Sequence, residues 1–305
     1  MRGRRELRGS ILVIASATCF GLMPIFAIYA YQNGLNVTTL LFLRFGIAAL
    51  LFFFYLVIKG ELRKLTYRET LNLLLLGGGL YTGQSFLYFS AVQYLTPALA
   101  ALLLYLYPLF VYILSVLLKE EKVTLRSLIA MGIALIGITL VLGYPNLGPI
   151  NMKGVYLAVG AALLYSIYII SGNRLSLKLS PIVTSSYISL FAAVSFLSII
   201  LVQEEFRLPL TWVGWISVWG VAIFSTVIAI LTFFAGTNWI GPTKASIISM
   251  IEPVVTILFA WILFKEHMTF IQILGAFIVL LGGVIITTEI PIHFKIKELL
   301  RRVQK

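Results

Sequence analysis

The side chains that could do acid–base or ionic chemistry in this sequence are few, and three of them lie inside long apolar runs. Glu252 sits near the middle of the run 243–264, where a charged side chain is costly and usually faces a partner or an internal space. Apolar surroundings favour a protonated carboxyl group, so Glu252 could exchange a proton or contact an ammonium group. It could equally brace the helix break that Pro253 introduces, and both interpretations stay open at this stage.

Two basic side chains could complement this carboxylate. Arg44 lies six residues into the run 38–58, about one and a half helical turns from the end of that run. It could attract a carboxylate or pair with Glu252, or it could extend outward to the surface or cap the preceding loop. Lys244 is only one or two residues into its run, so we expect it to reach the nearby surface.

Aromatic and polar side chains recur at helical spacing and form a candidate lining for a small-molecule site. Tyr81, Gln84, Ser85 and Tyr88 share one face of a predicted helix. Such a face suits an amphipathic solute with a ring or an aliphatic tail. Helix packing and interfacial placement explain at least half of such residues equally well. The other candidates for this lining are Phe20, Met23, Tyr105, Tyr112, Tyr165 and Tyr168.

Three prolines are candidates for kinks or gates. Pro24, Pro108 and Pro253 each fall inside an apolar run, where proline removes a backbone hydrogen bond and frees carbonyl groups. We expect helix interruptions at all three positions.

Other chemistry has little support in the sequence. Cys19 is the only cysteine, all eleven acidic residues are Glu, and His267 and His293 lie far apart, so we expect no metal site. The glycines at 77–79 lie inside an apolar run with no Lys-Ser/Thr after them, which argues against a phosphate loop. No cofactor is predicted.

The elements that must position these residues are membrane-spanning helices. The chain is 60% apolar and 11% charged over 305 residues, which excludes a soluble enzyme, a nucleic-acid binder and a disordered protein. A spanning helix needs about 20 apolar residues, so the sequence predicts an all-α integral membrane protein with ten transmembrane helices. The runs lie at about 11–31, 38–58, 70–92, 97–118, 125–143, 154–173, 181–202, 213–237, 243–264 and 270–288.

The distribution of charge predicts how these helices are oriented. With alternating spans, 18 of the 23 Lys and Arg residues fall on the side of the N-terminus, so both termini are predicted to be cytoplasmic. The segment 291–305 reads as a basic amphipathic tail at the interface. A cleaved signal peptide at the N-terminus is the less favoured alternative, because the first apolar run continues to Tyr31.

An internal repeat divides the chain into two halves. A constant offset of 145 residues aligns Pro97 with Pro242, Pro108 with Pro253, and Glu121 with Glu266. The predicted units are 1–145 and 146–290, with five helices in each. Because five is odd, the second half would enter the membrane from the opposite side, and secondary transporters are built from such inverted repeats.

The chain resembles the drug/metabolite transporter superfamily, in its EamA branch. The resemblance covers essentially the whole chain and is carried by the segment 20–24 (Phe-Gly-Leu-Met-Pro), Arg44-Phe45, and the span ends Lys119-Glu120-Glu121 and Phe264-Lys265-Glu266. It implies a multi-pass permease of the cell membrane whose central cavity accepts amino acids, other metabolites or drugs.

The leading hypothesis is a secondary transporter of small organic solutes, most simply an amino-acid exporter, working by alternating access around a midplane cavity. Its partners would be a small-molecule substrate, the lipid bilayer and, if transport is coupled, protons, and the chain would act as a monomer or homodimer without nucleic acid. The alternatives are an uncoupled facilitator or multidrug permease and, in a different class, a membrane-embedded enzyme. The enzyme is disfavoured because no catalytic cluster lies at one depth.

Overall fold

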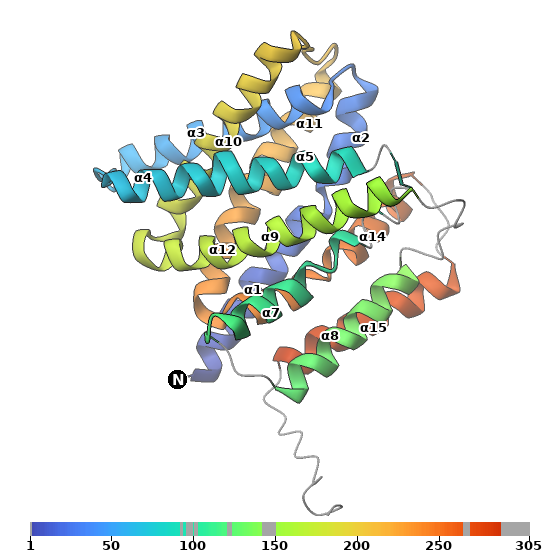
Figure 1. Ribbon diagram of the computed structural model, residues 1–305. Coiled ribbons are helices and arrows are strands. Elements are labelled where there is room, and N and C mark those ends of the chain that lie inside the picture. Colours follow the sequence, from blue (N-terminus) through green and yellow to red (C-terminus); the bar gives the residue numbers. More distant parts are fainter. Residues whose placement is uncertain are drawn as a thin grey trace, which may run out of the picture.

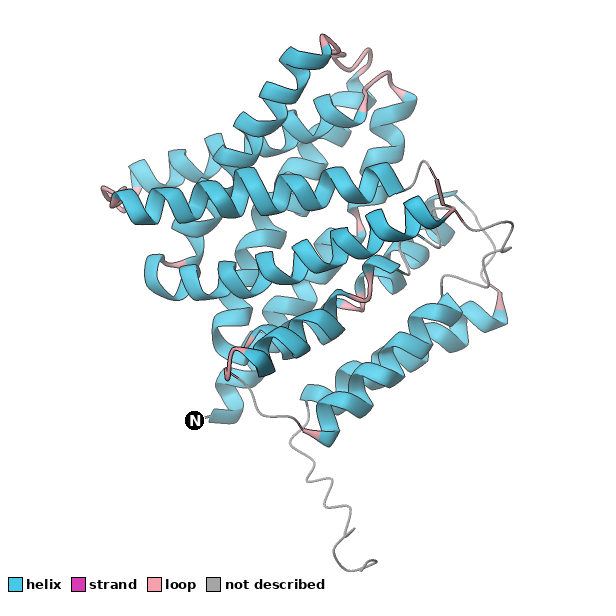
Figure 2. Ribbon diagram, in the orientation of Figure 1, coloured by secondary structure: helices cyan, strands magenta, loops and turns pink. Residues whose placement is uncertain are grey.

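The computed structural model describes residues 2–91, 94–95, 100, 103–120, 124–141, 151–264 and 269–287. These residues form helices joined by short turns and contain no strand, which confirms the all-α prediction for the described part of the chain (Figures 1 and 2). The segment 291–305, His267, His293 and Pro97 lie outside the described residues. The helices are α1 (Arg2–Gly21), α2 (Met23–Gln32), α3 (Val37–Ile58), α4 (Tyr67–Leu74), η1 (Leu75–Tyr81), α5 (Thr82–Ala91), α7 (Tyr107–Leu117), α8 (Leu125–Val141), α9 (Met152–Leu179), α10 (Pro181–Gln203), α11 (Trp212–Ala222), η2 (Ile223–Ile228), α12 (Ala229–Ile240), α13 (Pro242–Ser249), α14 (Glu252–Phe264) and α15 (Phe270–Thr287).

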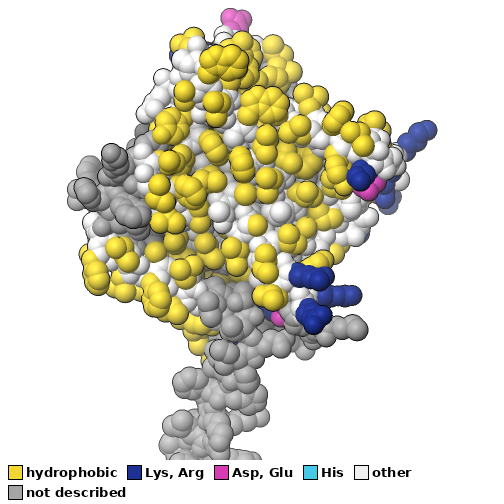
Figure 3. All heavy atoms as spheres, turned by 180° about the vertical axis from the view of Figure 1, so that it is seen from behind, with side chains coloured by type: hydrophobic (Ala, Val, Ile, Leu, Met, Phe, Trp, Pro, Cys, Tyr) yellow, Lys and Arg dark blue, Asp and Glu magenta, His cyan; other side chains and the backbone are white. Residues whose placement is uncertain are grey.

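Five helices are long and apolar enough to cross a membrane. They are 4–32, 37–58, 152–179, 181–203 and 212–240, so consecutive elements such as α11, η2 and α12 form one continuous rod. The surface is correspondingly apolar, and the Lys and Arg side chains drawn in Figure 3 gather along one edge of the visible face. This is the surface of a protein whose sides contact lipid.

Helices that are distant in sequence pack against each other in pairs. α8 lies along α15, α3 packs on α10, α1 on α12, and α5 on α9 (Figure 1). Two close backbone approaches recur at the offset of 145 residues. A Cβ atom at Gly9 would lie 2.6 Å from Cγ2 of Ile240, and one at Gly154 would lie 2.6 Å from Cγ of Leu95.

The same recurrence appears between α8 and α15. A Cβ atom at Gly137 would lie 2.6 Å from the backbone nitrogen of Val279, and one at Gly282 would lie 3.0 Å from Cβ of Ala134. Residues 137 and 282, and likewise 134 and 279, are each 145 apart. The contacts between the two parts of the chain are therefore reciprocal, as in an isologous interface.

Several of the long rods are interrupted, and proline accompanies three of the interruptions. Leu22 separates α1 from α2, just before Pro24. Met250 and Ile251 separate α13 from α14, and α7 begins at Tyr107. Because Pro108 is the second residue of α7, it needs no backbone hydrogen bond there.

Two further rods contain π-helical segments in place of a break. η1 continues α4 into α5 and η2 continues α11 into α12, so the rods bulge without ending. A π turn bonds residues five apart and leaves local backbone groups to be satisfied by side chains. In these segments Thr82 Oγ1 donates to Gly77 O at 3.0 Å, and Thr226 Oγ1 donates to Val221 O at 3.0 Å.

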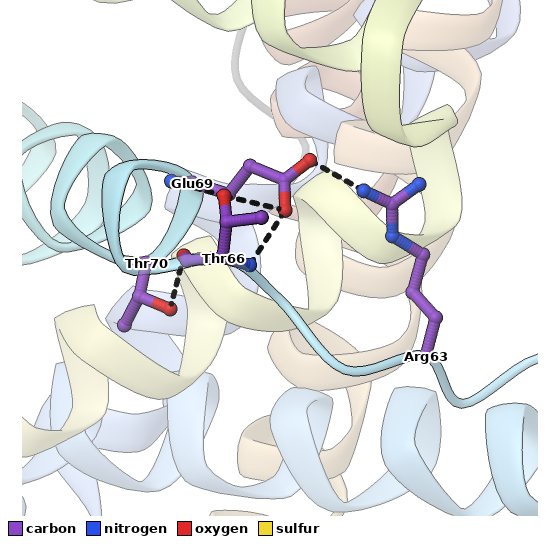
Figure 4. A network of polar contacts seen from close by, with 4 residues as sticks. All are labelled: Arg63, Thr66, Glu69 and Thr70. Carbon is purple, nitrogen blue, oxygen red and sulfur yellow. Dashed lines mark hydrogen bonds and ion pairs between the residues drawn. The ribbon is translucent and has the colours of Figure 1, made fainter.

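The start of α4 is fixed by a capping box (Figure 4). The Thr66 hydroxyl accepts from the Glu69 backbone N–H at 3.3 Å, and the Glu69 carboxylate accepts from the Thr66 backbone N–H at 2.8 Å. Glu69 also forms an ion pair with Arg63. The backbone N–H of Thr66 and, less strongly, the Thr66 hydroxyl and Arg63 hold the pKa of Glu69 below its usual value.

Candidate functional site

Arg44 of α3 lies in the interior of the helical assembly and is only 3% exposed. Its Nε donates to Thr226 Oγ1 at 2.7 Å, and its Nη2 donates to the Ser225 carbonyl at 2.9 Å. Both acceptors belong to η2. The expectation that Arg44 could extend outward to the surface is therefore wrong, because the bulged segment offers it acceptors inside the protein.

The rest of the guanidinium contacts two other elements. Nη1 lies 2.9 Å from the Met23 sulfur in α2, and Nη2 lies 3.4 Å from the Tyr81 hydroxyl at the end of η1. Tyr81 and Thr226 are 145 residues apart, so Arg44 joins equivalent positions of the two π-helical segments. No acidic side chain forms an ion pair with Arg44 among the described residues, and neutral groups solvate its charge.

The interruption after α1 supplies two carbonyl acceptors to neighbouring helices. Ser225 Oγ donates to Cys19 O at 2.8 Å, and Thr256 Oγ1 of α14 donates to Gly21 O at 2.8 Å. A Cβ atom at Gly21 would lie 2.8 Å from the Glu252 carbonyl, so glycine is needed for this close approach. The break near Pro24 thus packs directly on the start of α14.

A chain of aromatic rings extends from the break before α7 to Arg44. The ring centroids of Tyr107 and Tyr165 are 4.8 Å apart, those of Tyr165 and Tyr168 are 5.9 Å apart, and those of Tyr168 and Tyr81 are 4.7 Å apart. Tyr105 adjoins Tyr107 at 6.3 Å. We call these five residues from η1, α9 and the start of α7 the tyrosine column.

Glu252 is the first residue of α14 and is partly buried beside this column. Its carboxylate lies within electrostatic range of the hydroxyls of Tyr105, Tyr107 and Tyr165, and also of Tyr88. It is also within electrostatic range of the Arg44 guanidinium. The tyrosine column therefore separates an acidic group from a basic group inside the protein.

The remaining predicted residues divide between the column and other places. Gln84 is buried in α5, and Phe20 packs partly buried against the main core. Tyr112 lies elsewhere, because its hydroxyl accepts from the Thr124 backbone N–H at 2.8 Å and ties the end of α7 to the start of α8. Lys244 forms an ion pair with Glu6 at 3.5 Å, with 37% of its side chain exposed, as expected for a residue near the surface.

Four residues of this site were not among the sequence candidates. Tyr107 has a signal in the sequence, because it is 145 residues before Glu252. Ser225, Thr226 and Thr256 have none, since hydroxyls are common in apolar helices and only the positions of the bulges and breaks reveal their partners. Within the described residues, no three His, Cys or Glu side chains come together as a metal site would require.

The rings of the column fill the space between the helices that carry them, and the two largest hollows reported for the described residues lie elsewhere. One of about 550 Å³ is formed by 210–219 at the surface. The other, of about 340 Å³, lies between α4, η1 and α9. A solute at the column would have to displace aromatic side chains.

Sequence comparison places two matches to one family model on this chain. The EamA-like transporter family matches residues 7–143 and again residues 152–288. The second match begins and ends 145 residues after the first (152 − 7 and 288 − 143). The two matches together cover most of the chain.

Curated relatives are similar over most of their length. An uncharacterized transporter of Archaeoglobus fulgidus is 28% identical over 92% of this chain and 97% of its own, and the uncharacterized transporter YyaM of Bacillus subtilis is 26% identical over 78% and 80%. The aromatic amino acid exporter YddG of Ancylobacter novellus is 29% identical over 59% of this chain and 63% of its own. A crystal structure aligns with a TM-score of 0.80 at 19% identity, over 92% of this chain and 97% of the other, and shows a shared fold.

Proposed function

Because the chain belongs to the EamA-like transporter family, we propose that it moves small organic solutes across a cell membrane by alternating access. It is a multi-pass membrane protein and a transporter, not an enzyme. The proposed solutes are amino acids or related metabolites, aromatic ones first, and the proposed direction is export.

The proposed architecture is ten transmembrane helices in two inverted halves, 1–145 and 146–290, with both termini in the cytoplasm. The reciprocal contacts of Gly9 with Ile240 and of Gly154 with Leu95 support it, because a two-fold relation between the halves generates such pairs. The excess of Lys and Arg on the side of the N-terminus supports the orientation. Two equivalent halves can rock between two arrangements, each open to one side.

The observation that carries the proposal is Arg44, which is buried and paired with neutral groups only. A buried guanidinium without a carboxylate is poised to receive one, because arginine binds carboxylates through two parallel hydrogen bonds. Glu252 stands near the tyrosine column with the opposite charge. A zwitterionic solute with an apolar side chain would complement both groups and the rings.

The aromatic preference rests on two supports. The column offers four tyrosine rings with neighbouring centroids 4.7–5.9 Å apart, a range in which aromatic pairs attract each other. A relative of this chain is named an aromatic amino acid exporter.

The test is flux in proteoliposomes containing the purified full-length protein. Radiolabelled phenylalanine, alanine, a nucleoside and an organic cation would be compared with and without a proton gradient. We expect phenylalanine flux that the gradient accelerates and that Glu252→Gln uncouples. Glu61→Gln, an exposed loop residue, is the matched control and should behave as wild type.

The outcomes separate the proposed mechanisms. Flux that follows only the solute gradient and is unchanged in a folded Glu252→Gln protein would make the chain an uncoupled facilitator, with Glu252 bracing the break at Pro253. Flux of the nucleoside or cation at the rate of phenylalanine would indicate a multidrug permease. Absence of flux for all four solutes in both gradients would contradict the proposed substrate class.

A further inference from the structure

A groove between two helices combines basic and apolar side chains in one hollow. It lies between α4 with η1 on one side and α9 on the other, and it has a volume of about 340 Å³. We call it the basic groove. Its lining residues are Asn72, Leu75, Leu76, Leu80, Ser171, Arg174, Leu175 and Lys178.

The polar lining gathers where α4 begins and α9 ends. Arg174 and Lys178 are four residues apart on α9, so they stand one above the other on the same face. Arg68 lies one turn before Asn72 on the facing helix and adds a third positive charge near the mouth. Glu120 is the single acid beside them, and it contacts Arg174 through Nε at 2.5 Å.

This ion pair leaves the groove positively charged. Glu120 balances one of the three cations, and its contact does not use the two Nη nitrogens of Arg174. Arginine and lysine so placed favour a phosphate, because the planar fork and the ammonium both donate to its oxygens.

The rest of the groove is apolar and opens toward the sides of the protein. Leu75 is 56% exposed, and the neighbouring Leu74 is 42% exposed. Leu80 and Leu175 continue the apolar lining along η1 and α9. An anionic head group at Arg174 and Lys178 would therefore have its hydrocarbon chain running along leucines at the depth of the bilayer.

We propose that the basic groove is a binding site for one anionic phospholipid, with the phosphate at Arg174 and Lys178 and an acyl chain over Leu75 and Leu80. Basic pockets between membrane helices bind anionic head groups, and each nearby basic residue contributes about 1 kcal/mol, or about fivefold in affinity. A free phosphate would use the cations and leave the leucines without a partner, so the lining favours a lipid.

The position of the groove gives the lipid a structural consequence. α4 and η1 belong to the part of the chain before residue 145, and α9 belongs to the part after it. η1 also ends at Tyr81, which accepts a hydrogen bond from Arg44. A lipid in the groove would therefore hold the two parts together beside the site of Arg44.

The experiment is native mass spectrometry of the purified full-length protein with added phosphatidylglycerol or phosphatidylcholine, each at the same concentration. We expect one phosphatidylglycerol molecule to survive activation, and the double variant Arg174→Gln/Lys178→Gln to bind it about twentyfold more weakly. The matched control is Lys59→Gln/Lys64→Gln, which removes two cations from the exposed loop before α4 and should bind as wild type.

Three results would overturn the proposal. The first is equal retention of both lipids, and the second is equal weakening by the control pair. The third is stabilisation by inorganic phosphate to the same extent as by phosphatidylglycerol, which would assign the site to a free anion. If the double variant does not fold, Lys178→Gln alone keeps the Glu120–Arg174 ion pair and should weaken binding about fivefold. None of these measurements involves transport, so the result is independent of the proposed function.

Discussion

At the scale of single residues, the interior of this protein depends on how one buried charge is solvated. Arg44 donates to Thr226, Ser225, Met23 and Tyr81 from four elements, so it fixes the relative positions of α3, α2, η1 and η2. Each of these acceptors is neutral. The arrangement satisfies the guanidinium while leaving its charge available to a solute.

We expect Arg44→Met to destabilise the protein by about 3 kcal/mol, because several buried acceptors lose their donor together. Arg44→Lys should recover part of this loss, since an ammonium cannot reproduce the planar fork. Thermal unfolding in detergent, followed by size-exclusion chromatography, measures the difference. Arg63→Met, on an exposed arginine, should leave the transition within error, and an equal loss in both variants would contradict the role of Arg44.

The two tyrosines Tyr107 and Tyr112 of α7 should respond differently to loss of the hydroxyl. Tyr107→Phe removes a hydroxyl near Glu252 from the column and should lower phenylalanine flux about tenfold, roughly the effect of one hydrogen bond in a substrate site. Tyr112→Phe removes the acceptor for the Thr124 N–H and should cost about 1 kcal/mol of stability without changing the flux of the folded protein. Initial rates in proteoliposomes at matched protein content decide between these expectations, and a larger flux defect in Tyr112→Phe would contradict them.

The sequence predicted which chemistry was available more accurately than where it would lie. Tyr81, Tyr165 and Tyr168 were expected on inward faces and do lie together, because helical periodicity determines which residues share a face. Tyr112 was grouped with them, although its helix restarts at Tyr107 and its hydroxyl reaches the adjoining loop. The burial of Arg44 depends on acceptors that a π-helical segment offers, and no local pattern in 223–228 marks that segment.

At the scale of helices, proline and glycine determine where rods break and where they touch. The breaks near Pro24, Pro108 and Pro253 follow from the lost backbone hydrogen bond and were predictable. The three glycines at 77–79 suggested close helix contact, but only Gly77 and Gly78 approach another helix, and a Cβ atom at Gly79 would meet nothing within 4 Å. Sequence does not show which face of a bulged helix turns toward its neighbour.

The α8–α15 contact gives a sharp test of glycine packing. Gly137→Ala would place a Cβ atom 2.6 Å from the backbone nitrogen of Val279 and should cost about 2 kcal/mol or more. Gly132→Ala in the same helix meets nothing within 4 Å and should be neutral or stabilise by up to about 1 kcal/mol through helix propensity. Thermal unfolding of the two variants side by side provides the measurement. Similar transitions for both would contradict the close packing.

The capping box of α4 makes the start of this helix sensitive to pH. The pKa of Glu69 is lowered in the folded protein, so its contribution is fully present above the unfolded pKa of the carboxyl group and is lost as pH falls through the folded value. We expect hydrogen exchange at 67–70 to accelerate, after correction for intrinsic rates, when the pH is lowered below about 4. Glu69→Gln should abolish the pH dependence, and a dependence that persists in this variant would assign it to another group.

At the scale of the whole molecule, the two parts of the chain touch at both ends. At the end of the N-terminus, Glu120 meets Arg174 and Glu6 meets Lys244. At the opposite end, Asn33 forms a hydrogen bond with Thr211. In the proposed mechanism these contacts open alternately.

Tying the far end shut should stop transport. In a Cys19→Ser background, Asn33→Cys/Thr211→Cys joined by a short reducible bis-maleimide should lose flux and regain it on reduction. The control joins Arg63→Cys to Glu69→Cys, which lie within the first half and should keep their flux when linked. Undiminished flux across a complete Asn33–Thr211 link would refute rocking of the halves.

The Glu6–Lys244 ion pair has a consequence for how the protein waits between cycles. Positions 6 and 244 correspond, at the offset of 145, to Asn151 and Leu99, which cannot form an ion pair. Two identical halves would interconvert between arrangements of equal free energy, whereas here one arrangement gains a surface ion pair and the exchanged one does not. A surface ion pair contributes up to about 1 kcal/mol, so the resting population would be weighted up to about fivefold toward closure at the end of the N-terminus. Duplication supplied two interchangeable doors, and divergence at four positions decided which of them stands shut at rest.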